Sequence, residues 1–125
     1  MSDDRHARGL VVLEELLGAD AAAPILAAAD LSPDLVRFAV DFAFGEVLSR
    51  PGLDVKTREL CTVAALTVQG FALPQLKLHV EAARRCGATR EEVVEVITQM
   101  IAYGGFPAAT NALMTAKAAF DAEQS

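Results

Sequence analysis

The sequence has too few cysteines, too far apart, for a zinc site or a dithiol redox centre. Its two cysteines, Cys61 and Cys86, lie 25 residues apart and form no CxxC pair. Structural zinc sites and dithiol centres both depend on closely spaced thiols. We therefore expect no metal site. In a reducing compartment both cysteines are expected to be small buried hydrophobic residues, not a disulfide.

Long hydrophobic runs and targeting signals are also missing. No apolar run reaches the roughly 18 residues that a membrane-spanning helix needs. The longest mostly apolar stretch, residues 61–73, is interrupted by Thr62, Thr67, Gln69 and Gly70. The first nine residues, MSDDRHARG, begin with acids and lack the basic-then-apolar pattern of a secretory signal. These absences predict a cytoplasmic protein with no membrane contact.

Basic residues are scarce: 11 Lys and Arg stand against 17 Asp and Glu, for a net charge of −6. Because nucleic-acid affinity depends on clustered Lys and Arg, we expect no nucleic-acid partner.

The hydrophobic fraction is high, at 53%, which favours self-association through a large apolar interface. A length of 125 residues predicts a single domain over residues 1–125.

Strand patterns are absent, and helix punctuation is clear. Apolar and polar residues do not alternate over a strand-length window between turn signals. Ser32 precedes Pro33, and Thr89 with Glu92 has the spacing of a capping box, so these residues predict helix starts. The sequence therefore predicts an all-α bundle of about seven helices, near residues 4–17, 20–28, 33–48, 55–69, 75–85, 90–102 and 107–121.

Five segments of the chain together form a recognisable pattern: residues 50–54, 56–60, 74–79, 87–92 and 103–109. They resemble the carboxymuconolactone decarboxylase family, in the broader alkylhydroperoxidase-like superfamily. The resemblance covers over half the chain. It implies an all-α, alkylhydroperoxidase-like fold that assembles as a ring: a homohexamer built as a trimer of dimers, or a homotrimer.

Two departures from the family pattern bear on the chemistry. In the peroxidase branch two thiols precede the histidine, at the positions held here by Ala72 and Gln75. Their absence removes the dithiol cycle. In decarboxylases of the family the segment before the Arg50 loop resembles HAWGDIW, so Phe42 stands in place of a second histidine and Phe44 in place of a tryptophan.

His79 is the leading candidate for chemistry, because it is the only histidine outside the N-terminal segment, where His6 is expected to be solvated. An imidazole can act as a general acid near neutral pH. The alternative is a core histidine with one hydrogen bond. The resemblance implies Glu59 as its proton-relay partner. If the helices that carry Glu59 and His79 are ideal and antiparallel, the two residues are offset by about 7 Å along the helix axis.

That offset leaves three interpretations of Glu59 open. A water molecule or a substrate group lies between Glu59 and His79; Glu59 forms an ion pair with Arg84, which the same geometry places level with it; or Glu59 complements the dipole of its helix.

Five further residues are candidate substrate-binding groups. Arg50 is expected either to bind a substrate carboxylate or to anchor its loop. Gln75 lies one helical turn before His79 and is expected to orient the imidazole or a substrate carbonyl. Tyr103 belongs first to a turn before two glycines, and its phenol is a candidate donor to a ligand oxygen. Phe42 and Phe44 are expected to be core or pocket walls.

The resemblance implies a carboxy-lyase that needs no metal or cofactor and acts on a small anionic lactone or unsaturated acid, such as 4-carboxymuconolactone, with His79 as proton donor. Alternatives remain open: isomerisation or hydrolysis of a small lactone or 3-oxo acid, peroxidase activity through Cys61 or Cys86, and a non-catalytic oligomeric binding module.

Overall fold

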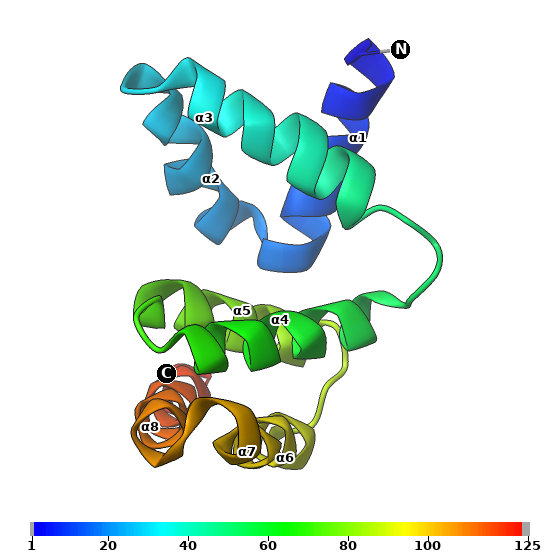
Figure 1. Ribbon diagram of the computed structural model, residues 1–125. Coiled ribbons are helices and arrows are strands. Elements are labelled where there is room, and N and C mark those ends of the chain that lie inside the picture. Colours follow the sequence, from blue (N-terminus) through cyan, green and yellow to red (C-terminus); the bar gives the residue numbers. More distant parts are fainter. Residues whose placement is uncertain (1, 124–125) are drawn as a thin grey trace. The chain divides into compact units, whose positions relative to one another are not determined.

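The computed structural model describes residues 2–123, and within them it contains helices and no strand. The prediction of an all-α fold is confirmed (Figure 1). The α-helices are α1 (Ser2–Leu17), α2 (Ala19–Ala27), α3 (Pro33–Phe38), α4 (Val55–Gln69), α5 (Leu73–Arg85), α6 (Arg90–Gln99), α7 (Ile101–Gly104) and α8 (Phe106–Ala122). A 3-10 turn, η1 (Ala28–Asp30), and a π-helix, η2 (Ala39–Val47), complete the described chain.

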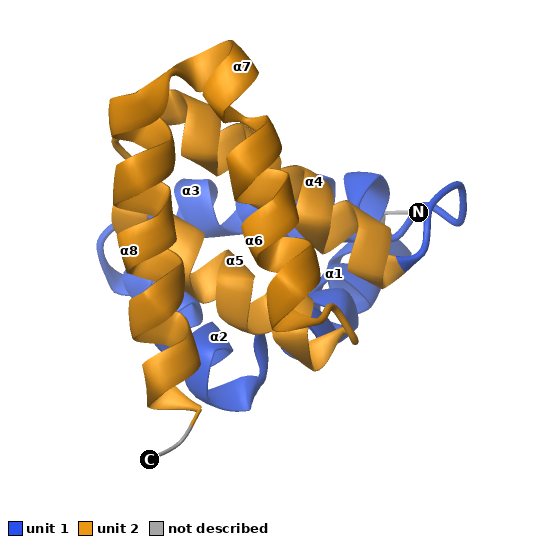
Figure 2. Cartoon of the chain, turned by 90° about the horizontal axis from the view of Figure 1, so that it is seen from below, with its two compact units in different colours: residues 1–54 blue, residues 55–125 orange. Residues whose placement is uncertain are grey.

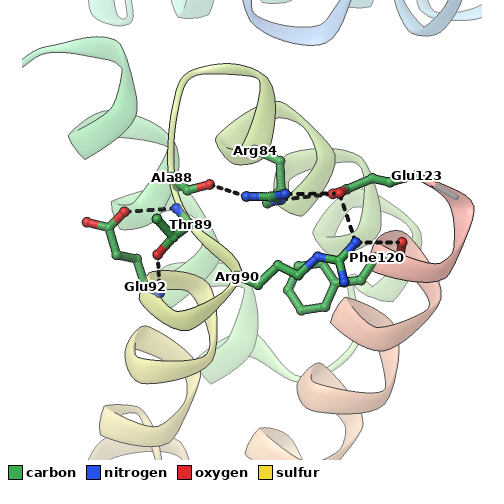
Figure 3. A network of polar contacts seen from close by, with 7 residues as sticks. All are labelled: Arg84, Ala88, Thr89, Arg90, Glu92, Phe120 and Glu123. Atoms are coloured by element: carbon green, nitrogen blue, oxygen red, sulfur yellow. Dashed lines mark hydrogen bonds and ion pairs between the residues drawn. The ribbon is translucent and has the colours of Figure 1, made fainter.

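Local capping interactions begin the helices where the sequence predicts them. The Ser32 hydroxyl accepts a hydrogen bond from the Leu35 N–H at 3.2 Å. The capping box of α6 is complete: the Thr89 N–H donates to Glu92 Oε1 at 2.9 Å, and the Glu92 N–H donates to Thr89 Oγ1 at 3.0 Å (Figure 3). These bonds satisfy N–H groups that the first helical turn leaves without an intrahelical partner.

The helix predicted for residues 33–48 changes type halfway. It begins as α3 and continues as the π-helix η2, whose last bond runs from the Leu48 N–H to the Ala43 carbonyl at 2.8 Å. Contacts with α1 accompany this change. Arg8 Nε donates to the Gly45 carbonyl at 2.7 Å, and a Cβ on Gly45 would overlap the carbonyl oxygen of Arg5. Glycine at this position lets the two helix backbones touch.

The chain forms two compact units, residues 1–54 and residues 55–125, coloured separately in Figure 2. In the first unit, α1 packs on η2. The second unit holds α4 to α8, and its core includes the side chains of Val63, Leu76 and Val80. Four alanines of α8 are buried in this core, so its backbone packs closely on its neighbours. They are Ala109, Ala112, Ala116 and Ala119.

Ion pairs and hydrogen bonds connect the C-terminal end of α8 with the end of α5 and the start of α6 (Figure 3). The Arg84 guanidinium donates to both carboxylate oxygens of Glu123, at 2.9 and 3.1 Å. Arg90 donates to Glu123 at 3.3 Å and lies over the Phe120 ring, 5.3 Å from its centroid. Hydrogen bonds from Arg84 foremost, and from Arg90, hold the pKa of Glu123 below its ordinary value.

Candidate active site

His79 and Glu59 form a direct hydrogen bond between the two helices of the α4–α5 hairpin. Nδ1 of His79 lies 2.7 Å from Oε1 of Glu59. The Glu59 side chain has no solvent exposure, and that of His79 is 16% exposed. A carboxylate can only accept, so Nδ1 carries the hydrogen and Nε2 is the nitrogen left for proton transfer. Buried carboxylate, oriented imidazole and a second ring nitrogen are the parts of a general acid–base pair.

This contact decides two of the three interpretations that the sequence leaves open. The offset of about 7 Å separates backbone levels on ideal helices, and the two side chains reach across it without a bridging group. Arg84 pairs with Glu123 and not with Glu59 (Figure 3). The ion pair between Glu59 and Arg84 that the same geometry allowed is therefore wrong.

The second oxygen of Glu59 is in a different situation from the first. Oε2 is buried and has no hydrogen-bond partner among the residues that the structure describes. A buried acceptor left in this state costs about 1–3 kcal/mol. The charge of Glu59 also reaches Cys86, whose thiol pKa is raised first by burial and then by this carboxylate.

Gln75 and Tyr103 belong to the same unit as the pair, but neither bonds to His79 among the described residues. Gln75 lies one turn before His79 on α5 and is exposed. Tyr103 is 75% exposed on α7, and the turn predicted after it is present, with Gly105 at φ 88°. Their roles toward a substrate stay predictions.

The remaining predicted residues lie in the first unit. Phe42 is exposed and Phe44 is partly buried, both on η2. Arg50 is exposed in the loop between η2 and α4, and it takes part in an interaction within the chain. Their roles toward a substrate also stay predictions.

His6 has a partner that the sequence did not predict. Its Nδ1 lies 2.6 Å from Oδ1 of Asp41 on η2. Asp41 is buried, and the His6 side chain is 51% exposed. The expectation of a merely solvated His6 missed this contact, because the partner lies 35 residues away on a helix of unexpected type. No local pattern signals such a pairing.

Hollows on the second unit include two that His79 does not line. One, of about 440 Å³, lies between α5 and α8. The other, of about 180 Å³, lies between α4 and α6 and includes Cys61. Cys61 is exposed and Cys86 is partly buried, so the expectation of two buried cysteines is wrong. Among the described residues, no group of three or more His, Cys, Asp and Glu side chains is arranged to hold a metal ion. None of the described helices combines the length and apolarity needed to cross a membrane.

Comparison with known proteins decides the family. The model of the carboxymuconolactone decarboxylase family matches residues 33–118. The chain belongs to this family. A 4-carboxymuconolactone decarboxylase of Acinetobacter baylyi is 37% identical over 122 residues, which cover 96% of this chain and 90% of the relative.

Two other relatives show the range of the similarity. An uncharacterised 15.0 kDa protein of Paracoccus denitrificans is 43% identical over 94 residues, 74% of this chain and 70% of that protein. A nitrosuccinic acid decarboxylase of Metarhizium robertsii is 30% identical over 118 residues, 90% of this chain and 82% of that protein.

The segment that the family model matches, residues 33–118, contains every predicted site residue. It spans η2, the Arg50 loop and the α4–α5 hairpin with Glu59 and His79. His6 lies outside it, although its partner Asp41 lies within.

Proposed function

We propose that the protein is a decarboxylase of small carboxylic acids in which His79 is the proton donor, with 4-carboxymuconolactone as the first candidate substrate. The observation that carries the proposal is the 2.7 Å bond between His79 Nδ1 and the fully buried Glu59. It orients the imidazole so that Nε2 performs the proton transfer. Family membership and two relatives named as decarboxylases support the reaction class.

The chemistry requires a substrate that can hold an electron pair. When CO₂ leaves, the electrons of the broken C–C bond stay on the substrate carbon, and a conjugated lactone carbonyl delocalises them. Protonated His79 then donates its Nε2 proton to carbon, and the neutral imidazole regains a proton from water. Glu59 stays ionised, holds the tautomer and stabilises the imidazolium. No metal or cofactor is needed in this scheme.

We assign the remaining residues by their chemistry. Arg50 binds the carboxylate that the substrate retains, because a guanidinium can bind a carboxylate in a bidentate manner. Gln75 and Tyr103 contact substrate oxygens. Phe42 and Phe44 form apolar walls, which favour loss of CO₂ from a poorly hydrated carboxylate.

The test is CO₂ release from 4-carboxymuconolactone and from nitrosuccinate, with wild-type protein and the His79→Asn variant. Asparagine keeps an N–H donor for Glu59 but has no titrating nitrogen. We expect turnover by the wild type and a loss of about 10²- to 10⁴-fold in the variant. Conversion of the lactone without CO₂ release would identify an isomerase or hydrolase instead. A wild type that leaves both acids unchanged would end the proposal.

We also propose that the protein self-associates, as a homohexamer or a homotrimer. The second unit exposes several large apolar side chains at the end of α4, on α7 and on α8: Val68, Phe71, Tyr103, Phe106, Leu113 and Met114. Where large apolar side chains gather on a surface, they mark protein interfaces. Light scattering after size-exclusion chromatography measures the mass directly, and a mass near the 13.2 kDa of one chain would refute the assembly.

A further inference from the structure

Only one of the two carboxylate oxygens of the buried Glu59 has a hydrogen-bond partner among the described residues. Oε1 binds His79 at 2.7 Å, while Oε2 has no hydrogen-bond partner among the described residues and no contact with solvent. Buried carboxylate oxygens are nearly always supplied with a donor. The spare oxygen therefore indicates that a further group near Glu59 acts together with the pair.

Cys86 is placed to be that group. It follows α5 directly, seven residues after His79, so the two side chains share a face of the helix two turns apart. Glu59 projects from α4 toward this face, because it bonds to His79 there. The thiol is partly buried.

The electrostatics fit a neutral thiol beside a carboxylate. Burial raises the pKa of Cys86 first, and the charge of Glu59 raises it further, against a smaller lowering by Arg85. The group therefore keeps its hydrogen at neutral pH and is a donor and a poor nucleophile. Cysteine S–H groups are weak donors, and a carboxylate is the kind of acceptor that strengthens them.

We propose that Cys86 is a positioning residue for the pair, with its S–H directed at Oε2 of Glu59. No direct hydrogen bond joins the two among the described residues. The proposal therefore requires a rotation of the thiol, or one bridging water, to connect Cys86 with Glu59. Cys86, Glu59 and His79 then form one chain of polar groups, with the carboxylate held at both oxygens. Only the consequence for turnover rests on the proposed decarboxylase activity.

The first experiment does not depend on activity. In a Cys61→Ala background Cys86 is the single thiol, and its alkylation by iodoacetamide is followed against pH. Glu59→Gln keeps the shape of the side chain and removes its charge. Since that charge raises the pKa of Cys86, the midpoint of alkylation should move to lower pH in the variant. A midpoint that stays in place, in protein shown to be folded by circular dichroism, would overturn the proposal.

The second experiment measures turnover of 4-carboxymuconolactone by three cysteine variants. Removing an outer partner of a metal-bound histidine typically costs about 10- to 100-fold, and we take the low end of that range for this metal-free pair. We expect Cys86→Ala to lower kcat about tenfold with KM unchanged, and Cys86→Ser to recover most of the loss. Cys61→Ala is the matched control and should equal the wild type.

The outcomes are distinguishable. Wild-type kcat in Cys86→Ala, or a loss in Cys86→Ala that serine does not recover, would refute the role. If the wild type decarboxylates neither 4-carboxymuconolactone nor nitrosuccinate, the proposed function fails, and the alkylation midpoint alone then decides whether Cys86 is coupled to Glu59.

Discussion

Glu59 holds Nδ1 of His79 at 2.7 Å from a position without solvent exposure. The two residues are 20 positions apart in sequence, on helices that run in opposite directions from a short turn. Their bond makes the carboxylate dependent on the imidazole for its only hydrogen bond among the described residues. The bond is therefore expected to matter for stability, apart from the proton transfer that we propose for His79.

Replacing His79 should separate these two roles. His79→Ala leaves Glu59 as a buried carboxylate without its donor, and breaking a buried pair in this way costs about 3–5 kcal/mol. His79→Asn retains a donor and should cost much less. Urea denaturation measures the difference. His6→Asn is the control for replacing a histidine elsewhere in the chain. The partner of His6 is Asp41 in the first unit, so this substitution leaves the bond between His79 and Glu59 unchanged. Equal losses in the two His79 variants would contradict this prediction.

Gly45→Ala should destabilise the first unit. The added Cβ would overlap the carbonyl oxygen of Arg5 and lie 3.1 Å from that of Val40, so the contact between α1 and η2 must open. Overpacking of this kind typically costs about 1–3 kcal/mol.

Gly52→Ala is the matched control, since a Cβ there meets nothing within 4 Å. Thermal denaturation should show a lower midpoint for the first variant and little change for the second. A Gly45→Ala protein as stable as Gly52→Ala would mean that the two backbones do not touch.

The bonds of Glu123 should make stability depend on pH. Arg84 and Arg90 hold its pKa below the ordinary value of 4.5. The stabilisation is therefore fully present above about pH 4.5 and is lost as the pH falls through the lower pKa of the folded state. Glu123→Gln should lower the thermal midpoint at pH 7, and its difference from wild type should shrink under acid conditions.

Glu95→Gln, a substitution of an exposed acid on α6, is the control for a general change in net charge. A difference between Glu123→Gln and wild type that is constant from pH 7 to pH 3 would show that the charge of Glu123 is unimportant.

Thr89→Ala should weaken the start of α6. The substitution removes the hydroxyl that accepts from the Glu92 N–H at 3.0 Å, and loss of such a cap costs about 1 kcal/mol of unfolding free energy. Thr89→Ser keeps the hydroxyl and should stay within a few tenths of a kcal/mol of the wild type. Chemical denaturation of both variants tests the cap, and a serine variant as unstable as the alanine variant would assign the effect to the lost methyl group.

The sequence by itself determined the helices and the family. Helix starts and ends depend on groups a few residues apart, such as Ser32 with Leu35 and Thr89 with Glu92, so they can be predicted from spacing alone. The motifs around Glu59 and His79 likewise identified the family that the comparison then confirmed.

Tertiary structure decided which of these residues meet. The direct bond between His79 and Glu59, the pairing of Arg84 with Glu123, and the contact of His6 with Asp41 join segments 20 to 39 positions apart. The π-helix at Ala39–Val47 accompanies contacts with α1. Each of these features depends on the distance between backbones after packing, to within an ångström or so, and helical periodicity does not define distances between helices that closely.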